Sequence, residues 1–164
     1  MKTARNSKEK ENHSMENDSV VTTVILIRHA ERDNSTATDP HLNAEGIARA
    51  QSLVHVMNKA EIKAIYTSNF IRTKETANLL ATHLGISPVQ IAETAALKTH
   101  ILENHSGKTV LVIGHSNTVP ELIGLLGGAG VFTIGDNEFD NLFVLTNFSL
   151  GITRTTQLKY GNPS

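Results

Sequence analysis

The chain has 164 residues, carries a net charge of −1 and contains no cysteine. This length suits one domain that buries roughly 70% of its unfolded surface, so a hydrophobic core can form without disulfides or a structural metal. The balanced charge and low aromatic content argue against a nucleic-acid-binding surface, and the missing cysteines exclude disulfides, thiolate catalysis and cysteine-ligated zinc.

Residues 1–19 contain almost no side chain that a core could bury, and their mixed charges predict a disordered polar tail. Residues 20–160 form the single predicted domain. No apolar run is long enough to span a bilayer, and no signal peptide is recognisable at the N-terminus. We therefore expect a cytoplasmic protein without a membrane partner. No exposed apolar stripe indicates an oligomeric state.

Apolar runs alternate with amphipathic segments through the rest of the chain. Residues 23–27 and 109–113 show no polar alternation, which is typical of strands buried on both faces of a parallel sheet. The other predicted strands are 64–67, 89–92, 142–146 and 152–158, the last of which alternates in polarity like an edge strand. Helices are predicted at 43–57, at 70–83, after the third strand through residue 102, and at 120–126. This order predicts a three-layer α/β/α sandwich with a mostly parallel central sheet.

Arginine and histidine side chains follow three of the predicted strands. Arg28 and His29 come directly after the first strand. Arg72 lies one turn into the helix that follows the second strand, and His115 follows the fourth. Because open α/β sheets bind ligands beyond the carboxyl ends of their strands, we expect these four side chains to meet at one rim of the sheet. Each residue alone is a weak sign, but their joint placement predicts a functional site.

These residue types suit phosphoryl-group chemistry. The planar guanidinium fork matches phosphate oxygens, keeps its charge, and stabilises the charge that develops in the transition state. A neutral imidazole can attack phosphorus, which gives a phosphohistidine and divides the reaction into two easier steps. A second imidazole can donate to a non-bridging oxygen. The helix that starts near Asn117 would direct its first backbone N–H groups at the same anion.

Three blocks of the sequence resemble those of the histidine phosphatase superfamily, whose fold is phosphoglycerate mutase-like. They are 26–31 (LIRHAE), 66–68 (YTS) with Arg72, Thr73, Thr76 and Ala77, and 112–116 (VIGHS). The segment 42–46 (LNAEG) also matches the usual start of the first helix. The resemblance covers about residues 22–158 and implies a small phosphatase of the superfamily's first branch. It implies His29 as the phosphorylated nucleophile, a phosphate pocket of Arg28, Arg72 and His115, and no metal or organic cofactor.

The chain departs from the family pattern in two respects. Ala30 stands where the family usually has glycine, which is a change between small residues. The general acid that protonates the leaving oxygen is also not evident. We favour Glu93, which follows the third strand as the family's acid does. Glu31, Asp136 and Glu138 are alternatives, as is an enzyme without a dedicated acid, which would suit a good leaving group such as the imidazole of a phosphohistidine.

The expected substrate is a phosphorylated small molecule or a phosphoprotein. We expect Glu31, Asn34 and Ser116 to contact it beside the catalytic residues. Two alternative functions stay open, namely phosphoglycerate mutase-type phosphoryl transfer and a catalytically idle phosphate-binding module. The short connections favour hydrolysis over mutase activity, because a mutase must exclude water while its product reorients. The complete set of Arg28, His29, Arg72 and His115 argues against a module that only binds.

Overall fold

The structure, a computed structural model, describes residues 20–149, 151 and 153–164. The predicted tail at 1–19 lies outside the described residues, and so does Ile152, the first residue of the last predicted strand. Within the described part of the chain, no helix combines the length and apolar character needed to cross a membrane.

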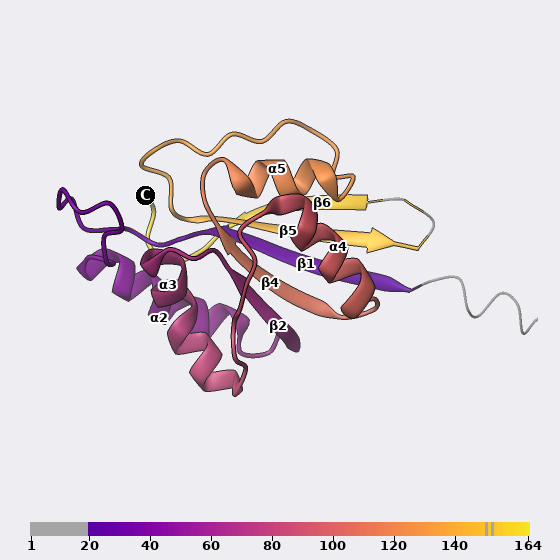
Figure 1. The fold of residues 1–164 in the computed structure, drawn as a ribbon, viewed down its shortest axis with the longest axis horizontal. Coiled ribbons are helices and arrows are strands. Elements are labelled where there is room, and N and C mark those ends of the chain that lie inside the picture. The colour runs from indigo at the N-terminus through magenta and orange to yellow at the C-terminus, as the bar shows by residue number, and fades with distance from the viewer. Residues whose placement is uncertain (1–19, 150, 152) are drawn as a thin grey trace, which may run out of the picture.

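Strands and helices alternate along most of the described chain (Figure 1). The strands are β1 (Val21–Arg28), β2 (Ile62–Thr67), β3 (Val89–Gln90), β4 (Thr109–Gly114), β5 (Asn141–Phe148) and β6 (Thr153–Lys159). The helices are α2 (Ala44–Met57), α3 (Ile71–Leu84), α4 (Thr94–Asn104) and α5 (Thr118–Leu125). Each predicted element is present with bounds shifted by a few residues, and the third strand is shorter than predicted.

The strands form one six-stranded sheet in the order β3-β2-β4-β1-β5-β6. The pairs among β3, β2, β4 and β1 are parallel, whereas β5 runs antiparallel to both β1 and β6. The sheet is therefore mostly parallel, as predicted, and β6 lies at its edge. The carboxyl ends of β1, β2 and β4 meet at the same rim.

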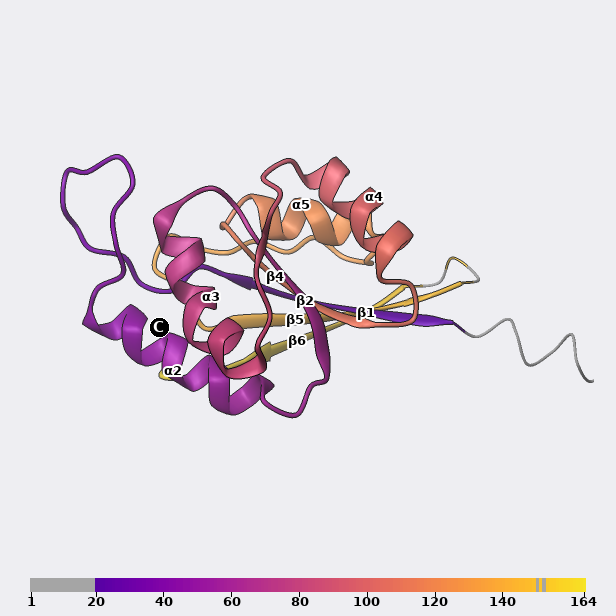
Figure 2. The same cartoon turned by 60° about the horizontal axis from the view of Figure 1, so that its bottom comes forward.

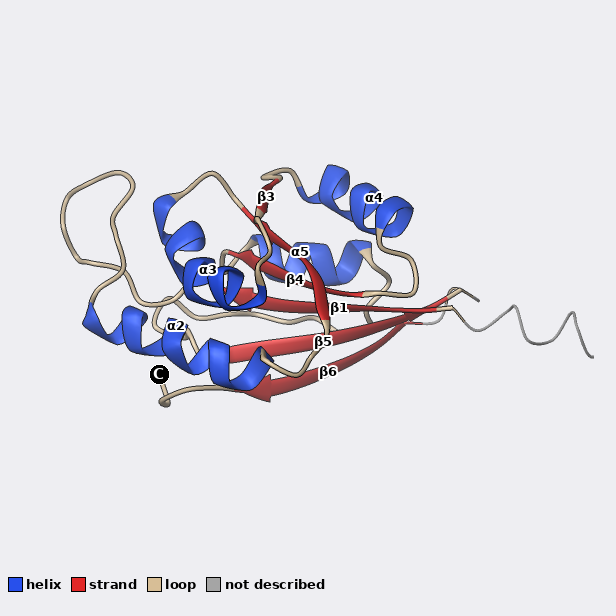
Figure 3. Ribbon diagram, turned by 90° about the horizontal axis from the view of Figure 1, so that it is seen from below, coloured by secondary structure: helices blue, strands red, loops and turns tan. Residues whose placement is uncertain are grey.

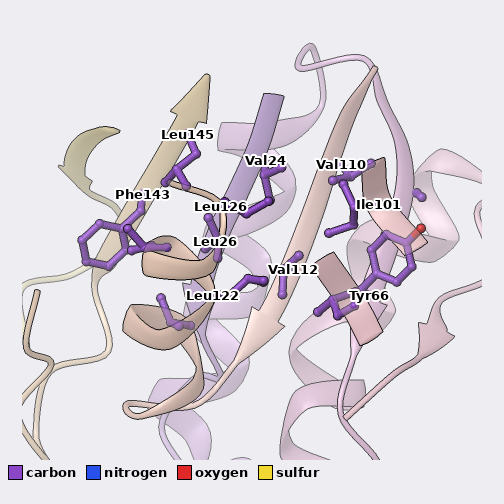
Figure 4. Packing of buried hydrophobic residues seen from close by; sticks show 14 of the residues in the cluster. Val24, Leu26, Tyr66, Ile101, Val110, Val112, Leu122, Leu126, Phe143 and Leu145 are labelled. Carbon is purple, nitrogen blue, oxygen red and sulfur yellow. The ribbon is translucent and has the colours of Figure 1, made fainter. Parts of the chain in front are cut away.

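Helices cover both faces of the sheet, which gives the predicted three layers (Figures 2 and 3). Alternate residues of β1 pack into two hydrophobic cores, one on each face of the sheet. Val24 and Leu26 pack into the cluster beneath α4 and α5, part of which is shown in Figure 4. Ile25 and Ile27 pack into the cluster beneath α2 and α3. This burial on both faces explains why β1 lacks polar alternation.

The start of α2 packs closely against the chain that follows β1. Asn43 caps the helix, because its side-chain oxygen accepts a hydrogen bond from the Gly46 backbone N–H. A Cβ atom at Gly46 would lie 2.1 Å from the Glu31 carbonyl oxygen, so only glycine fits this approach. The segment 42–46 thus fixes the backbone two residues beyond His29.

Candidate active site

A pocket of about 550 Å³ lies at the carboxyl ends of β1, β2 and β4. Side chains after three strands line it, together with parts of the loops 29–43 and 126–140. The lining residues are Arg28, His29, Arg32, Thr38, Pro40, Ser68, Phe70, Arg72, Ala92, His115, Ser116, Asn117, Thr118 and Asp136. The structure therefore brings together the two arginines and two histidines that the sequence placed at one rim.

The His29 imidazole is held as a neutral ring with one free nitrogen. Its Nδ1 atom lies 2.8 Å from the Ala30 carbonyl oxygen. Because a carbonyl only accepts, Nδ1 carries the proton and Nε2 keeps its lone pair. Burial lowers the pKa of His29 to about 3, and the charges of Arg28 and Arg72 act in the same direction. At neutral pH the ring has the protonation state that a nucleophile requires.

Helix α3 fixes the residue that follows His29. The Ala30 backbone N–H donates to Thr76 Oγ1 at 2.9 Å, and this hydroxyl donates in turn to the Arg72 carbonyl at 2.7 Å. The Ala30 methyl group is fully buried in a small cluster with Leu42 and Ala50. The alanine that departs from the family's glycine therefore fits the fold.

Arg28 connects the pocket to the loop 126–140. Its Nη1 atom donates to the carbonyl oxygens of Gly135, Asp136 and Glu138 at 2.9, 2.8 and 3.0 Å. Its guanidinium carbon lies 4.1 Å from the centroid of the Phe139 ring. The Nε atom of Arg28 is buried and has no hydrogen-bond partner among the described residues.

Arg72 is fixed from two sides in a similar way. Its Nη1 atom lies 3.5 Å from the Asp39 carboxylate, and its guanidinium carbon lies 4.2 Å from the Phe70 ring centroid. The Nε atom of Arg72 is also buried without a partner in the described structure. A buried donor that lacks an acceptor costs about 1–3 kcal/mol. Arg28 and Arg72 thus each retain a donor that has no acceptor among the described residues.

His115 belongs to a chain of hydrogen bonds. Arg72 Nη2 lies 3.5 Å from His115 Nδ1, and because a guanidinium only donates, Nδ1 is the acceptor. His115 Nε2 then carries the proton and donates to Ser68 Oγ at 2.8 Å. Ser68 Oγ lies 3.0 Å from Thr73 Oγ1, which donates to the Phe70 carbonyl at 2.8 Å. The ring of His115 is therefore fixed in orientation and tautomer.

The two imidazole rings lie close together in the pocket. The centroids of His29 and His115 are 5.4 Å apart, with the rings edge to face. Burial, together with the charges of Arg72 and Arg28, lowers the pKa of His115 to about 4. Both rings are thus neutral at neutral pH in the unliganded protein. A bound dianion would oppose the arginine charges and favour protonation of His115.

Of the other predicted site residues, Ser116 lines the pocket and Glu93 does not. The exposed Glu93 carboxylate accepts hydrogen bonds from the backbone N–H groups of Ala95 and Ala96 at 3.0 and 2.6 Å, so it caps α4. Among the alternative acids, Asp136 lines the pocket. The Glu138 carboxylate accepts from the Gly135 backbone N–H at 2.9 Å.

Glu31 and Asn34, predicted to contact substrate, do not line the pocket either. The buried Glu31 carboxylate pairs with Arg49 of α2, at 2.6 Å from Nη2 and about 3 Å from Nε. Asn34 lies in the exposed part of the loop 29–43. The structure therefore does not bring Glu31 and Asn34 to the pocket, although both lie close to His29 in the sequence.

The sequence analysis missed several residues that line the pocket or contact its arginines. Phe70 and Phe139 support the arginines, and Asp39 accepts a hydrogen bond from the Ile71 backbone N–H at 3.0 Å besides approaching Arg72. Arg32, which the sequence analysis did not single out, also lines the pocket. A signal for Asp39 was present in the Asp-Pro step of a polar loop, but nothing in the sequence pairs that loop with α3.

Comparisons with known proteins address the fold and the family that the sequence resembles. Residues 24–98 match the family model of the histidine phosphatase superfamily, branch 1. A comparison with curated proteins found no match. Among solved structures, the protein histidine phosphatase SixA complexed with tungstate is 20% identical, with a TM-score of 0.69 over 84% of this chain and 96% of that chain.

Two further solved structures have the same fold. The mycobacterial glucosyl-3-phosphoglycerate phosphatase is 13% identical, with a TM-score of 0.67 over 88% of this chain and 100% of that chain. YhfR of Bacillus stearothermophilus is 18% identical, with a TM-score of 0.62 over 76% of this chain and 90% of that chain. The fold of the chain is that of the phosphoglycerate mutase-like α/β proteins. Within that class, residues 24–98 are similar to the histidine phosphatase superfamily, branch 1.

Proposed function

We propose that the chain is a phosphatase that hydrolyses a phosphomonoester or phosphohistidine through a phosphohistidine on His29, without a metal. The observation that carries the proposal is the pair of buried, unpartnered Nε atoms of Arg28 and Arg72 beside a neutral imidazole. Phosphoryl oxygens are negatively charged acceptors, which suits them to pair with both guanidinium groups. The similarity of residues 24–98 to the histidine phosphatase superfamily supports the same function.

The reaction proceeds in two displacements. His29 Nε2 attacks phosphorus, and the bond breaks between phosphorus and the leaving atom, which is the ester oxygen or the imidazole nitrogen of a phosphohistidine. A leaving atom that needs a proton takes it from the general acid. A water molecule then attacks the phosphorus of the phosphohistidine on His29 and gives a proton to the conjugate base of that acid. The bond between phosphorus and Nε2 breaks, inorganic phosphate is released, and the lone pair returns to Nε2. Arg28 and Arg72 stabilise the charge on the equatorial oxygens in both steps, and protonated His115 donates to one of them. Ser116 and the first turn of α5 supply further donors.

Relatives of similar fold are named for two kinds of substrate. One is a protein histidine phosphatase whose structure contains tungstate, and another is a glucosyl-3-phosphoglycerate phosphatase. For this chain we propose a phosphorylated small molecule or phosphoprotein as substrate. A pure phosphate-binding module is less consistent with the site, because binding alone does not require His29 to be held as a neutral imidazole with a free Nε2.

Hydrolysis of p-nitrophenyl phosphate in the presence and absence of EDTA tests the proposal. We expect turnover that the chelator does not change. Loss of turnover with EDTA, restored by a divalent metal, would contradict metal independence. Retained phosphate binding without turnover of any phosphomonoester or phosphohistidine would favour the binding module.

We predict that Arg72→Ala lowers kcat/KM for p-nitrophenyl phosphate by roughly 10²–10³-fold, the usual effect of removing one donor to transition-state charge. Arg72→Lys should recover only a small part, because an ammonium group lacks the planar fork. Circular dichroism of both variants checks that the fold persists. A folded Arg72→Ala variant with parental activity would exclude Arg72 from the phosphate pocket.

We predict that Asp136, the carboxylate that lines the pocket, protonates the leaving oxygen. Asp136→Asn should then lower kcat by about 10²-fold or more for an alkyl phosphate such as glycerol phosphate, but only slightly for p-nitrophenyl phosphate, whose leaving group departs unprotonated. Glu93→Gln is the matched carboxylate control, and its two rates should change little because Glu93 caps α4. The same leaving-group dependence in Glu93→Gln instead of Asp136→Asn would identify Glu93 as the acid.

A further inference from the structure

Arg32 is fixed on a rigid part of the loop 29–43. The backbone around it runs antiparallel to the segment before α2, with an isolated bridge between Arg32 and Leu42. The Asp33 N–H donates to the His41 carbonyl at 2.8 Å, and the Asn43 N–H donates to the Glu31 carbonyl at 3.0 Å. The tip of this loop projects from the rim of the sheet (Figures 1 and 2), but the backbone of Arg32 lies on the paired base of the loop.

The base of the loop is also tied to α3. The Asp39 carboxylate accepts from the Ile71 backbone N–H at 3.0 and 3.1 Å. The Glu75 carboxylate accepts from the Leu42 backbone N–H at 2.8 Å. Both contacts join the loop to the helix that carries Arg72. The position of Arg32 relative to the phosphate pocket is therefore fixed by several hydrogen bonds.

Neighbouring residues of this extended segment have opposite orientations. Glu31 turns toward Arg49 of α2 and away from the pocket, whereas Arg32 lines the pocket with Arg28 and Arg72. The exposed Arg32 guanidinium has no hydrogen-bond or ion-pair partner among the described residues. Its charge is close enough to contribute to the lowered pKa of both Arg28 and Arg72. Like charges gathered in this way are unfavourable until an anion joins them.

We propose that Arg32 recognises a second anionic group, a carboxylate or a further phosphate, on the leaving group of a small phosphomonoester. The proposal rests on the proposed function, which assigns the transferred phosphoryl group to Arg28 and Arg72. Those two side chains are also held by the protein, through Asp39 for Arg72 and through backbone carbonyls for Arg28. Arg32 is the pocket arginine whose guanidinium remains without such a partner in the described structure. The pocket volume of about 550 Å³ is in the range of small-molecule sites and exceeds what one phosphoryl group requires.

A matched pair of aryl substrates tests the proposal. Phenyl phosphate and 4-carboxyphenyl phosphate differ in the second anionic group, and 4-phosphonophenyl phosphate replaces that carboxylate by a phosphorus oxyanion. The measured quantity is kcat/KM for each substrate that carries a second anionic group, divided by kcat/KM for phenyl phosphate. We expect Arg32→Gln to lower at least one of the two ratios by about tenfold, and the affected ratio identifies the anion. Arg154→Gln removes the same charge from the exposed part of β6 and should leave both ratios unchanged.

The outcomes separate this proposal from the proposed function. If both ratios are unchanged in a folded Arg32→Gln variant, Arg32 does not recognise the second anionic group. Turnover of phenyl phosphate by the same protein would still support the phosphatase. Absence of turnover in the parent protein would contradict the phosphatase itself. In that case the Kd values of phenylphosphonate and 4-carboxyphenylphosphonate still test Arg32, because binding requires no reaction. The kcat/KM for an acidic phosphopeptide is measured in the same way. If Arg32→Gln lowers it more than it lowers kcat/KM for both small substrates with two anionic groups, the small-molecule assignment is wrong.

Discussion

His29→Ala is expected to abolish turnover of p-nitrophenyl phosphate, with a loss on the order of 10⁴-fold or more. The reason is that the proposed pathway has no other route to a covalent intermediate. The Nδ1 proton is held by the Ala30 carbonyl, so the lone pair on Nε2 is available at neutral pH without a general base. Steady-state kinetics of parent and variant, together with circular dichroism of both, measure the effect.

Trapping the intermediate makes this test specific for a nucleophile. Rapid quench in alkali after mixing with ³²P-labelled phosphoester should give an acid-labile, alkali-stable phosphoprotein in the parent and none in His29→Ala. His115→Ala should slow turnover yet still form the phosphoprotein, because His115 donates to an oxygen and does not attack. His55→Ala, on the exposed face of α2, is the control for loss of any histidine. Label that persists in His29→Ala would assign the nucleophile to another residue.

The parts of the site predicted correctly from the sequence share one physical basis. Residues 24–27 and 110–113 are apolar throughout because both faces of β1 and β4 are covered by helices. Parallel strands of this kind end at one rim, so whatever follows them must meet there. This argument brought Arg28, His29 and His115 together without any knowledge of their contacts. The same logic reached Arg72, one turn into α3.

Two carboxylates that the sequence analysis favoured, Glu93 and Glu31, do not line the pocket, because local hydrogen bonds and ion pairs hold them elsewhere. Glu93 was favoured as the acid because it follows β3, but at that point the next helix begins and the first N–H groups of α4 take its oxygens. Glu31 was expected at the substrate because it adjoins His29. The orientation of Glu31 depends on the backbone pairing between residues 31–33 and 41–43. The loop has no alternation of polar and apolar residues that would predict this pairing.

The position of the loop 126–140 could not be predicted from the sequence. The structure shows the anchoring contact, in which Arg28 donates to three carbonyl oxygens of this loop. Every residue has a backbone carbonyl group, so the sequence does not indicate which carbonyl groups accept hydrogen bonds from Arg28.

Glu31→Gln is expected to lower the free energy of unfolding by about 3–5 kcal/mol, because it leaves the Arg49 charge buried without its counter-ion. The side chains of Arg49 and Glu31 are only 3% and 11% exposed, so water cannot take over the role of the carboxylate. Arg49 also donates to the carbonyls of Tyr160 and Asn162 at 2.7 and 2.8 Å, so the loss should loosen the last residues of the chain. Urea unfolding of parent and variant measures the difference.

The same variant decides between the two roles considered for Glu31. A carboxylate that contacts substrate would raise KM when replaced and leave the unfolding midpoint unchanged. A carboxylate that neutralises Arg49 would lower the midpoint and leave KM of the folded protein nearly unaltered. The double variant Glu31→Gln/Arg49→Met removes both charges and should recover part of the lost stability, since no unpaired charge then remains in the interior. Stability that falls further in the double variant, by the sum of the two single losses, would show that the two side chains do not act as a pair.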